Sequence, residues 1–188
     1  MNSPIGVPHV SDGDIVQRVL RGDATAWTTL VHAHQDAVFR LAYLLLGDSS
    51  DAEDVAQDTF LRAYRALPRF DAAKPLRPWL LQIARRLAYN RQRSLRRYLA
   101  ALRRYASTQT PYVWQGTNPT TVADALVLRA AVGRLARPDQ EIIYLRYYLD
   151  LSVEETATVL DVAPGTVKSR LHRALTRLRD EMVLAEQP

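Results

Sequence analysis

Apolar residues recur every three or four positions along most of this chain, whereas alternation of apolar and polar residues does not form a clear run. The three- and four-residue spacing is typical of amphipathic helices, and alternation is typical of half-buried strands. The sequence therefore predicts an all-α protein. The predicted helices begin near Ser11, near Trp27, at Asp51, at Trp79, near Val122, at Pro138, at Ser152 and at Pro164.

Glycines predict where two of these helices end, and apolar positions predict which residues of another helix face the core. Gly22 and Gly47 are expected to end the first two, because glycine readily adopts the left-handed backbone found after a helix. In the helix that follows Pro138, four residues are expected to face the core. These are Ile142, Ile143, Leu145 and Tyr147.

The segment from Leu151 to Arg179 predicts two helices joined by a tight turn. Ser152 and Glu155 have the spacing of a capping box, so the first helix starts there and is expected to end near Leu160. Pro164 suits the first position of the second helix, because a proline lacks the amide that would have no partner at that position. The second helix is expected to run toward Arg179.

The second of these helices has an apolar stripe and a basic face. Its core stripe is predicted to be Val167, Leu171, Ala174 and Leu178. Hydroxyl and basic side chains project elsewhere on the helix, which suits contacts to phosphates and base edges in a major groove. An ordinary solvated basic helix at the end of a bundle is the alternative.

The helix from Asp51 carries carboxylates on one side, with Asp54 and Asp58 following at helical spacing. Four interpretations are open: general acid or base groups, metal ligands, a protein-docking face, or a solvated face favoured by the helix N-terminus. Because this segment contains neither histidine nor cysteine, a solvated face or a docking face is favoured.

The helix from Trp79 is rich in arginine, and Phe70, Trp79 and Tyr89 interleave with the basic residues. This mixture is expected where unstacked bases meet aromatic faces and phosphates meet guanidinium groups. The alternative for Phe70 and Trp79 is a place in the core.

The charge is unevenly distributed along the chain. The net charge is +5, yet residues 1–60 carry 3 basic and 9 acidic side chains, whereas residues 61–110 carry 13 and 1. Blocks of opposite sign indicate two different partners. The absence of cysteine excludes disulfides, thiolate zinc sites and cysteine nucleophiles. His32 and His34 do not form a metal pair, because residues two apart on a helix point to different sides.

Segment composition predicts two domains. Residues 105–121 are rich in Ser, Thr, Pro and Gly, as in a linker, and residues 1–10 resemble a loose tail. The domains are therefore expected at 11–104 and 122–184. The chain lacks a membrane-length apolar run and a signal peptide pattern, so we expect a cytoplasmic protein without membrane insertion. We expect no cofactor.

Over residues 12–183 the chain resembles the bacterial sigma factors of the extracytoplasmic-function (ECF) group, the two-domain minimal form of the sigma-70 family. The sequence DAEDVAQDTFLRAY (51–64) resembles region 2.2 of that family. Phe70, Trp79-Leu80 and Ile83-Ala84 resemble regions 2.3 and 2.4, and the sequence from LRYYLDLSVEETA to LTRLR resembles region 4.2. The resemblance implies a transcription initiation subunit without a catalytic site.

The resemblance also implies partners and site residues. The partners are core RNA polymerase, through the clamp coiled coil of its β′ subunit and through its β subunit, promoter DNA, and an anti-sigma factor. The residues for core polymerase are Asp51, Glu53, Asp54, Gln57, Asp58 and Leu61. Those for the −10 element, where a base is flipped into a pocket, are Phe70, Lys74, Arg77, Trp79, Arg85, Arg86, Tyr89, Asn90 and Arg93. Those for the −35 duplex are Thr166, Lys168, Ser169, Arg170, Arg173 and Arg177.

Two residues depart from the family pattern: Arg86 stands where Asn is frequent, and Glu141 stands where Arg is frequent. The preferred promoter sequence therefore does not carry over from the family. The alternatives to a sigma factor are a stand-alone helix-turn-helix regulator and an enzyme that uses the carboxylate cluster. The regulator would not need the acidic helix and the basic loop, and the histidines are too scattered for the enzyme.

Overall fold

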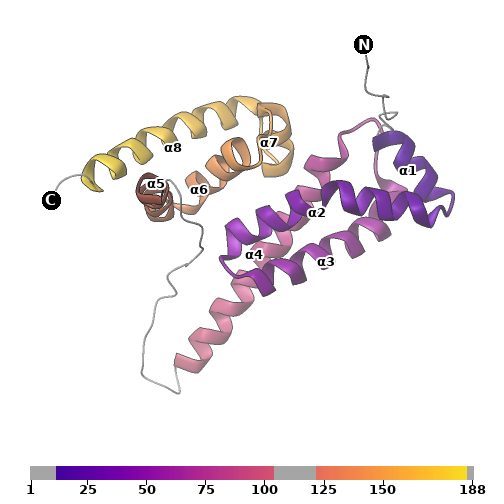
Figure 1. The fold of residues 1–188 in the computed structure, drawn as a ribbon, viewed down its shortest axis with the longest axis horizontal. Coiled ribbons are helices and arrows are strands. Elements are labelled where there is room, and N and C mark those ends of the chain that lie inside the picture. The colour runs from indigo at the N-terminus through magenta and orange to yellow at the C-terminus, as the bar shows by residue number, and fades with distance from the viewer. Residues whose placement is uncertain (1–11, 104–121, 186–188) are drawn as a thin grey trace, which may run out of the picture.

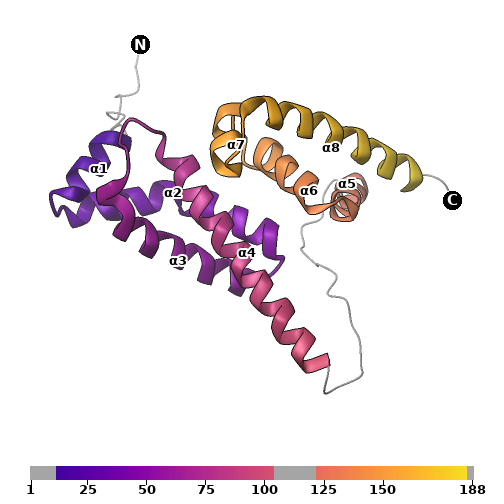
Figure 2. The same ribbon diagram turned by 180° about the vertical axis from the view of Figure 1, so that it is seen from behind.

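The computed structural model describes residues 12–103 and 122–185, and within these ranges the regular structure is helical (Figures 1 and 2). The predicted all-α class is confirmed. The expected tail at 1–10 and the expected linker at 105–121 lie outside the described residues. The helices are α1 (Asp12–Leu20), α2 (Ala24–Leu46), α3 (Ser49–Ala66), α4 (Leu76–Arg103), α5 (Val122–Arg134), α6 (Arg137–Ile143), α7 (Val153–Leu160) and α8 (Pro164–Ala185). A 3-10 turn (Leu67–Arg69) follows α3, and a π-helical turn (Tyr144–Tyr148) follows α6.

The helices form two domains. In the first, α2, α3 and α4 pack against one another and α1 packs against α2; in the second, α8 packs against α5, α6 and α7 (Figure 1). Helix α7 also lies against α4, so the two domains are in contact. Fully buried leucines such as Leu30, Leu41, Leu80 and Leu81 fill the first domain. Each such burial stabilises the fold by roughly 1.5–3 kcal/mol.

Local caps explain where α2 and α3 begin and end. The Asp23 carboxylate accepts the amides of Thr25 and Ala26 at the start of α2, and Gly47 ends α2 with a left-handed φ of 77°. Helix α3 begins at Ser49 rather than at the predicted Asp51, because the Asp48 side chain accepts the Asp51 amide and so caps the helix earlier.

Helix α4 begins at Leu76, so the predicted start at Trp79 was wrong. Pro75 and Pro78 flank this start. A proline within the first turn does not interrupt a helix, because the first amides have no intrahelical partner.

The capping box of α7 is confirmed. The Ser152 amide donates to Glu155 Oε2 at 2.7 Å, and the Glu155 amide donates to Ser152 Oγ at 3.0 Å. Helix α7 ends at Leu160, and α8 begins at Pro164 as predicted but continues to Ala185, past the predicted end at Arg179.

In the helix predicted from Pro138, one residue that was expected to face the core is exposed. Ile142, Ile143 and Leu145 are buried as expected, but Tyr147 is 60% exposed. The reason is that α6 widens into the π-helical turn, in which each residue rotates less about the axis than in an α-helix. Tyr147 therefore misses the buried face.

His34 is a buried titratable group on α2. Its Nε2 lies 3.7 Å from Oδ1 of Asp12. Burial lowers the pKa of His34 below its ordinary value of 6.5; the Asp12 carboxylate opposes this shift, and the Arg77 charge adds to it. The folded chain therefore keeps His34 neutral to a lower pH than the unfolded chain does.

This shift predicts a loss of stability in acid. Between the two pKa values the unfolded chain binds more protons, so the free energy of unfolding should fall as the pH drops through 6.5, and the loss should be complete below the folded pKa. His34→Gln should reduce this dependence, because the substituted side chain does not titrate. Urea unfolding of both proteins on either side of pH 6.5 measures the difference. An equal loss in both proteins would contradict the assignment.

Candidate nucleic-acid interface

The outer face of α3 gathers most of the predicted polymerase-binding residues. Glu53, Asp54, Gln57 and Asp58 are exposed there beside Leu61, which is 57% exposed. The opposite face was predicted to pack inward: Ala52, Thr59, Phe60 and Ala63 are buried there, and Ala56 is partly buried against the core. The Thr59 hydroxyl donates to the Val55 carbonyl at 2.7 Å, so this buried polar group is satisfied.

Asp51 lies apart from this exposed face. Its side chain is only 18% exposed, and Arg91 Nη2 of α4 donates to its Oδ1 at 2.6 Å and to Asp54 Oδ2 at 3.2 Å. The hydrogen bond and the charge of Asp51 raise the pKa of Arg91. Asp51 therefore joins α3 to α4, a role that helical spacing alone does not reveal.

An apolar groove between α1, α2 and α3 borders the acidic face and was not predicted from the sequence. Trp27, Phe60, Leu61 and Tyr64 line it. The Trp27 ring meets Tyr64 edge to face with centroids 5.0 Å apart. The available signal was the pair Leu61 and Tyr64, two large apolar side chains at helical spacing on the polar side of α3.

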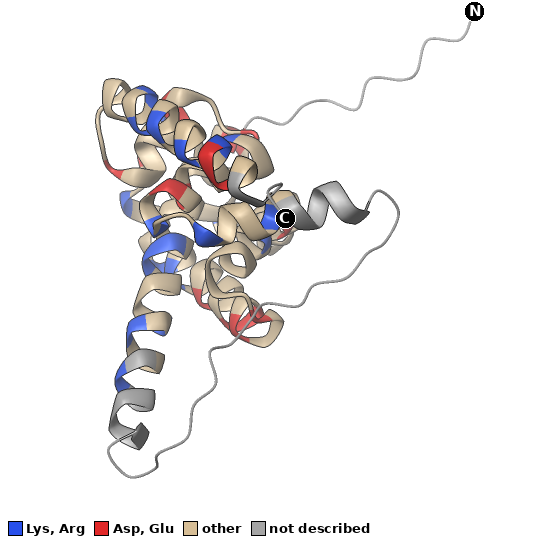
Figure 3. Cartoon of the chain, turned by 90° about the vertical axis from the view of Figure 1, so that its left-hand side faces the viewer, with Lys and Arg blue, Asp and Glu red and all other residues tan. Residues whose placement is uncertain are grey.

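The residues predicted for the −10 element follow the loop before α4 and one side of that helix, where basic side chains are frequent (Figure 3). Lys74, Arg86, Asn90 and Arg93 are exposed. Phe70 and Trp79 pack on each other, with ring centroids 4.6 Å apart, and both lie half-buried against the core. The two rings thus pack against the core on one side and are partly exposed to solvent on the other.

Arg77, Arg85 and Tyr89 contact the second domain. Arg85 Nε donates to Glu141 Oε1 at 2.5 Å, Arg85 Nη2 donates to Glu141 Oε2 at 3.1 Å, and Arg77 Nη2 donates to the Leu149 carbonyl at 2.8 Å. The Arg85 guanidinium carbon lies 5.2 Å from the centroid of the Tyr89 ring. Burial opposes ionisation of Arg85, but the hydrogen bond and charge of Glu141 outweigh it and raise its pKa.

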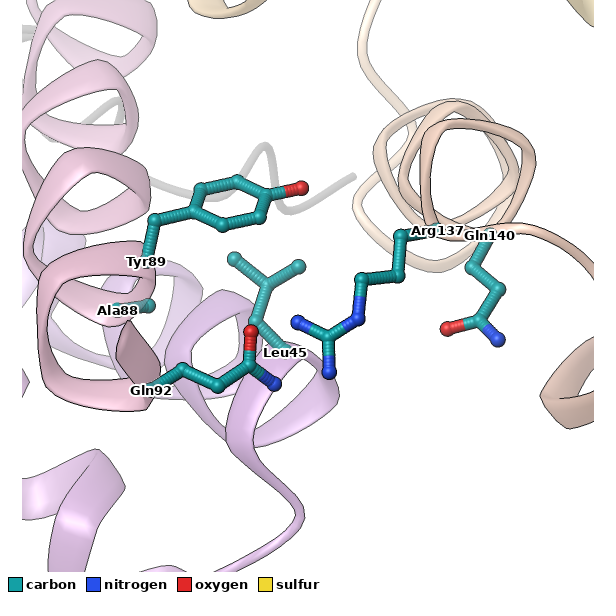
Figure 4. A pocket seen from close by; sticks show the side chains of 6 residues that line it. All are labelled: Leu45, Ala88, Tyr89, Gln92, Arg137 and Gln140. Atoms are coloured by element: carbon teal, nitrogen blue, oxygen red, sulfur yellow. The ribbon is translucent and has the colours of Figure 1, made fainter. Parts of the chain in front are cut away.

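A small crevice lies beside these contacts, between α4 and α6 (Figure 4). Tyr89 and Gln92 extend into it from α4, and Arg137 extends toward them from α6. Gln140 donates to the carbonyls of Gly133 and Leu135, which braces the loop before α6. Burial and the Glu141 charge raise the pKa of Tyr89, so the phenol stays protonated.

Helix α8 presents the residues predicted for the −35 element. Its core stripe is confirmed, since Val167, Ala174 and Leu178 are buried and Leu171 packs against them. Lys168, Ser169, Arg173 and Arg177 are exposed, and Thr166 and Arg170 are half-buried. Arg177 is also paired with the buried Asp139 of α6. Arg177 therefore braces α8 within its domain.

Among the described residues, no group of three or more His, Asp or Glu side chains could hold a metal ion. The helices at 12–103 and 122–185 include none whose length and apolar character would let it cross a membrane.

Comparison with known families assigns both domains. Residues 30–98 match the sequence model of Sigma-70 region 2, and residues 125–178 match Sigma-70, region 4. The chain is 32% identical to the ECF RNA polymerase sigma factor SigW of Bacillus subtilis over 176 residues, which cover 89% of this chain and 94% of the relative. The chain belongs to the ECF sigma factors.

A second relative of this sigma factor is the ECF RNA polymerase sigma factor SigL of Mycobacterium tuberculosis, 34% identical over 158 residues that cover 84% of this chain and 89% of the relative. The match of region 2 in addition to region 4 disfavours the stand-alone helix-turn-helix regulator.

Two solved structures share the fold of this sigma factor. CnrH in complex with the cytosolic domain of CnrY matches with a TM-score of 0.68 and 24% identity, covering 94% of this chain and 99% of that one. RpoE in complex with the anti-sigma factor NepR from Bartonella quintana matches with a TM-score of 0.66 and 24% identity, covering 86% and 98%.

The two arginines of α8 predict different effects on the stability of this sigma factor. Arg177→Ala should lower the free energy of unfolding by on the order of 1–3 kcal/mol, because it leaves the buried Asp139 carboxylate without its cation. Arg173→Ala should change it by less than about 0.5 kcal/mol, because Arg173 is exposed. Chemical unfolding of both variants measures the contrast. Equal effects would mean that Arg177 does not brace α8.

Proposed function

We propose that this sigma factor docks on core RNA polymerase through α3, opens and reads the −10 element through α4 and its preceding loop, and reads the −35 element as duplex through α8. The observation that carries the proposal is the presence, on one chain of a sigma factor family, of an exposed acidic face and two separate basic helices.

The α3 face supports docking on another protein. Its carboxylates surround the exposed Leu61, so an apolar contact has a charged rim. Such rims speed encounter with a partner of opposite charge and set the orientation of the complex. The proposed partner is the clamp coiled coil of the β′ subunit, with the β subunit as a further contact of the chain.

The loop and α4 support binding to unpaired bases. Flipping a base out of the stack costs a few kcal/mol, which stacking and hydrogen bonds in a protein pocket must offset. Phe70 and Trp79 supply half-exposed rings, and Lys74, Arg86 and Arg93 supply exposed cations for the backbone. Asn90 supplies an exposed amide beside them.

Helix α8 supports binding to duplex DNA. Its first turn begins at Pro164, and the free amides at a helix N-terminus attract phosphate. Ser169, Lys168 and Arg173 are exposed on the following turns, where base edges of a major groove would lie.

We further propose that the chain acts in the cytoplasm and as a non-enzymatic subunit that uses no cofactor, with the chemistry of initiation left to the polymerase. An anti-sigma protein is its proposed antagonist. Support comes from the two structural neighbours, which form complexes with the cytosolic domain of CnrY and with the anti-sigma factor NepR.

Run-off transcription tests the function and the docking face together. Purified core polymerase with this sigma factor should initiate at selected sequences from a promoter library, and no specific initiation above core alone would overturn the function. Asp58→Lys should abolish initiation and co-purification with core, because it reverses an exposed charge of the proposed docking face. The matched control is Asp36→Lys, an exposed aspartate on α2, which should leave both unchanged.

Arg173 separates DNA reading from docking. Arg173→Ala should weaken binding to −35 duplex by about 1–3 kcal/mol, the size of one lost base contact, while binding to core stays intact. Fluorescence anisotropy with duplex from a promoter selected in the run-off assay measures the first quantity, and co-purification measures the second. Unchanged duplex affinity would mean that this part of α8 does not enter the groove.

A further inference from the structure

The second domain covers part of α4, where α7 packs against it, and the C-terminal half of α4 extends away from that domain (Figures 1 and 2). In five polar contacts across this boundary the donor belongs to α2 or α4 and the acceptor belongs to the second domain. The pairs are Arg85 with Glu141, Arg77 with the Leu149 carbonyl, Gln82 with the Thr158 carbonyl, Arg40 with the Tyr148 carbonyl, and Arg86 with Asp161.

The acceptors, apart from Glu141, lie at the C-terminal ends of helices. Tyr148 and Leu149 close the π-helical turn, Thr158 lies in the last turn of α7, and Asp161 is its C-cap. Helix C-termini carry unpaired carbonyls and a partial negative charge. The second domain thus offers α4 an array of oxygen acceptors, the chemistry that a nucleic-acid backbone would offer.

Glu141 makes the strongest of these contacts. Its side chain is 5% exposed and that of Arg85 is 24% exposed, and two hydrogen bonds join them. A carboxylate buried to this extent is stable only while its cation stays in place. The two residues are 56 positions apart in the sequence and belong to different domains. Their pairing therefore depends on the contact between domains.

Three of the arginines in these contacts are among those assigned above to the −10 element. Arg77 and Arg85 donate to acceptors of the second domain, and Arg86 lies 4.0 Å from Asp161. While these contacts hold, Arg77 and Arg85 cannot serve single-stranded DNA, whereas the side chain of Arg86 stays 63% exposed. The contact between the domains and binding of the −10 element through Arg77 and Arg85 therefore exclude each other.

The promoter itself requires an open chain. Positions −10 and −35 are 25 base pairs apart, which is about 85 Å of straight duplex at about 3.4 Å per base pair. In this structure α7 packs directly on α4. A chain that reads both elements must therefore separate its domains.

We propose that the second domain is a built-in competitor for the −10 surface, with the Arg85–Glu141 pair as its main lock, so that the free sigma factor masks α4 until polymerase holds the domains apart. The inference rests on the proposed role of α4. Only molecules with separated domains bind DNA through α4. The apparent affinity of the free chain is therefore the affinity of the open form multiplied by the fraction of molecules that are open.

The test uses the full chain labelled at one exposed site in each domain. Because the sequence lacks cysteine, Asp36→Cys on α2 and Thr176→Cys on α8 give two unique spin-label sites, and both residues are exposed. Pulsed dipolar spectroscopy then reports the distance between domains. Glu141→Arg should shift this distance to longer values, because it places two cations at the lock.

Two controls accompany this variant. Glu154→Arg makes the same charge change at an exposed site of α7 and should keep the short distance. The exchange Arg85→Glu with Glu141→Arg restores an ion pair and should return the short distance, which separates opening from unfolding. Equal distances between domains in Glu141→Arg and Glu154→Arg would show that the Arg85–Glu141 pair does not hold the domains together. A long distance in the exchange variant would show the same.

The mask is tested by DNA binding of the same proteins. A fluorescent single-stranded DNA with the non-template −10 sequence of a promoter selected in the run-off assay should bind Glu141→Arg on the order of tenfold tighter than Glu154→Arg. Both variants carry the same added positive charge, so a difference between their DNA affinities does not come from net charge. If the domains separate and DNA binding is not tighter, the second domain does not mask α4, and the proposed role of α4 in −10 binding is wrong. If the distance between domains does not change, the Arg85–Glu141 pair does not hold them together.

Discussion

The arrangement of this sigma factor depends on how the arginines of α4 find anionic partners. The helix buries Leu80, Leu81 and Ala84 in the first domain, so its many cations must lie on the remaining surface. Arg91 is neutralised by carboxylates of α3, and Arg85 by Glu141 of the second domain. The same helix therefore connects α3, the proposed −10 surface and the second domain.

Burial decides which of these ion pairs matter. Exposed pairs such as Arg134 with Glu181 contribute little, because water and salt screen them. Pairs with one buried member, such as Arg85–Glu141 and Arg177–Asp139, hold helices together more strongly, because water and salt screen them less. One such pair fixes α8 within its domain, and the other spans two domains.

The two pairs have different consequences for function. Arg177 can brace α8 permanently, since α6 and α8 belong to one domain and move together. Arg85 joins domains that promoter binding must separate, so its pair is broken whenever the sigma factor works as proposed. The contact that shields α4 in the free chain includes both polar pairs and apolar packing, because the buried apolar residues of the two domains form one continuous cluster.

Much of the local structure was predictable from the sequence, because it depends on neighbours in the chain. The caps at Ser152 and Gly47 and the start of α8 at Pro164 were predicted correctly from residues a few positions apart. The early starts of α3 and α4 were missed, since a capping carboxylate and a tolerated proline shift a boundary without changing the apolar pattern. The π-helical turn was missed as well, and with it the exposure of Tyr147.

The sequence by itself determined the helices, the apolar faces that pack them and the family to which the chain belongs. Only the tertiary structure decided which charged side chains are paired: Asp51 with Arg91, Asp139 with Arg177, and Glu141 with Arg85. These partners lie between 38 and 56 residues apart, beyond the reach of the helical periodicity on which sequence patterns rest. Their pairing follows from the packing of whole helices, which depends on the complete core.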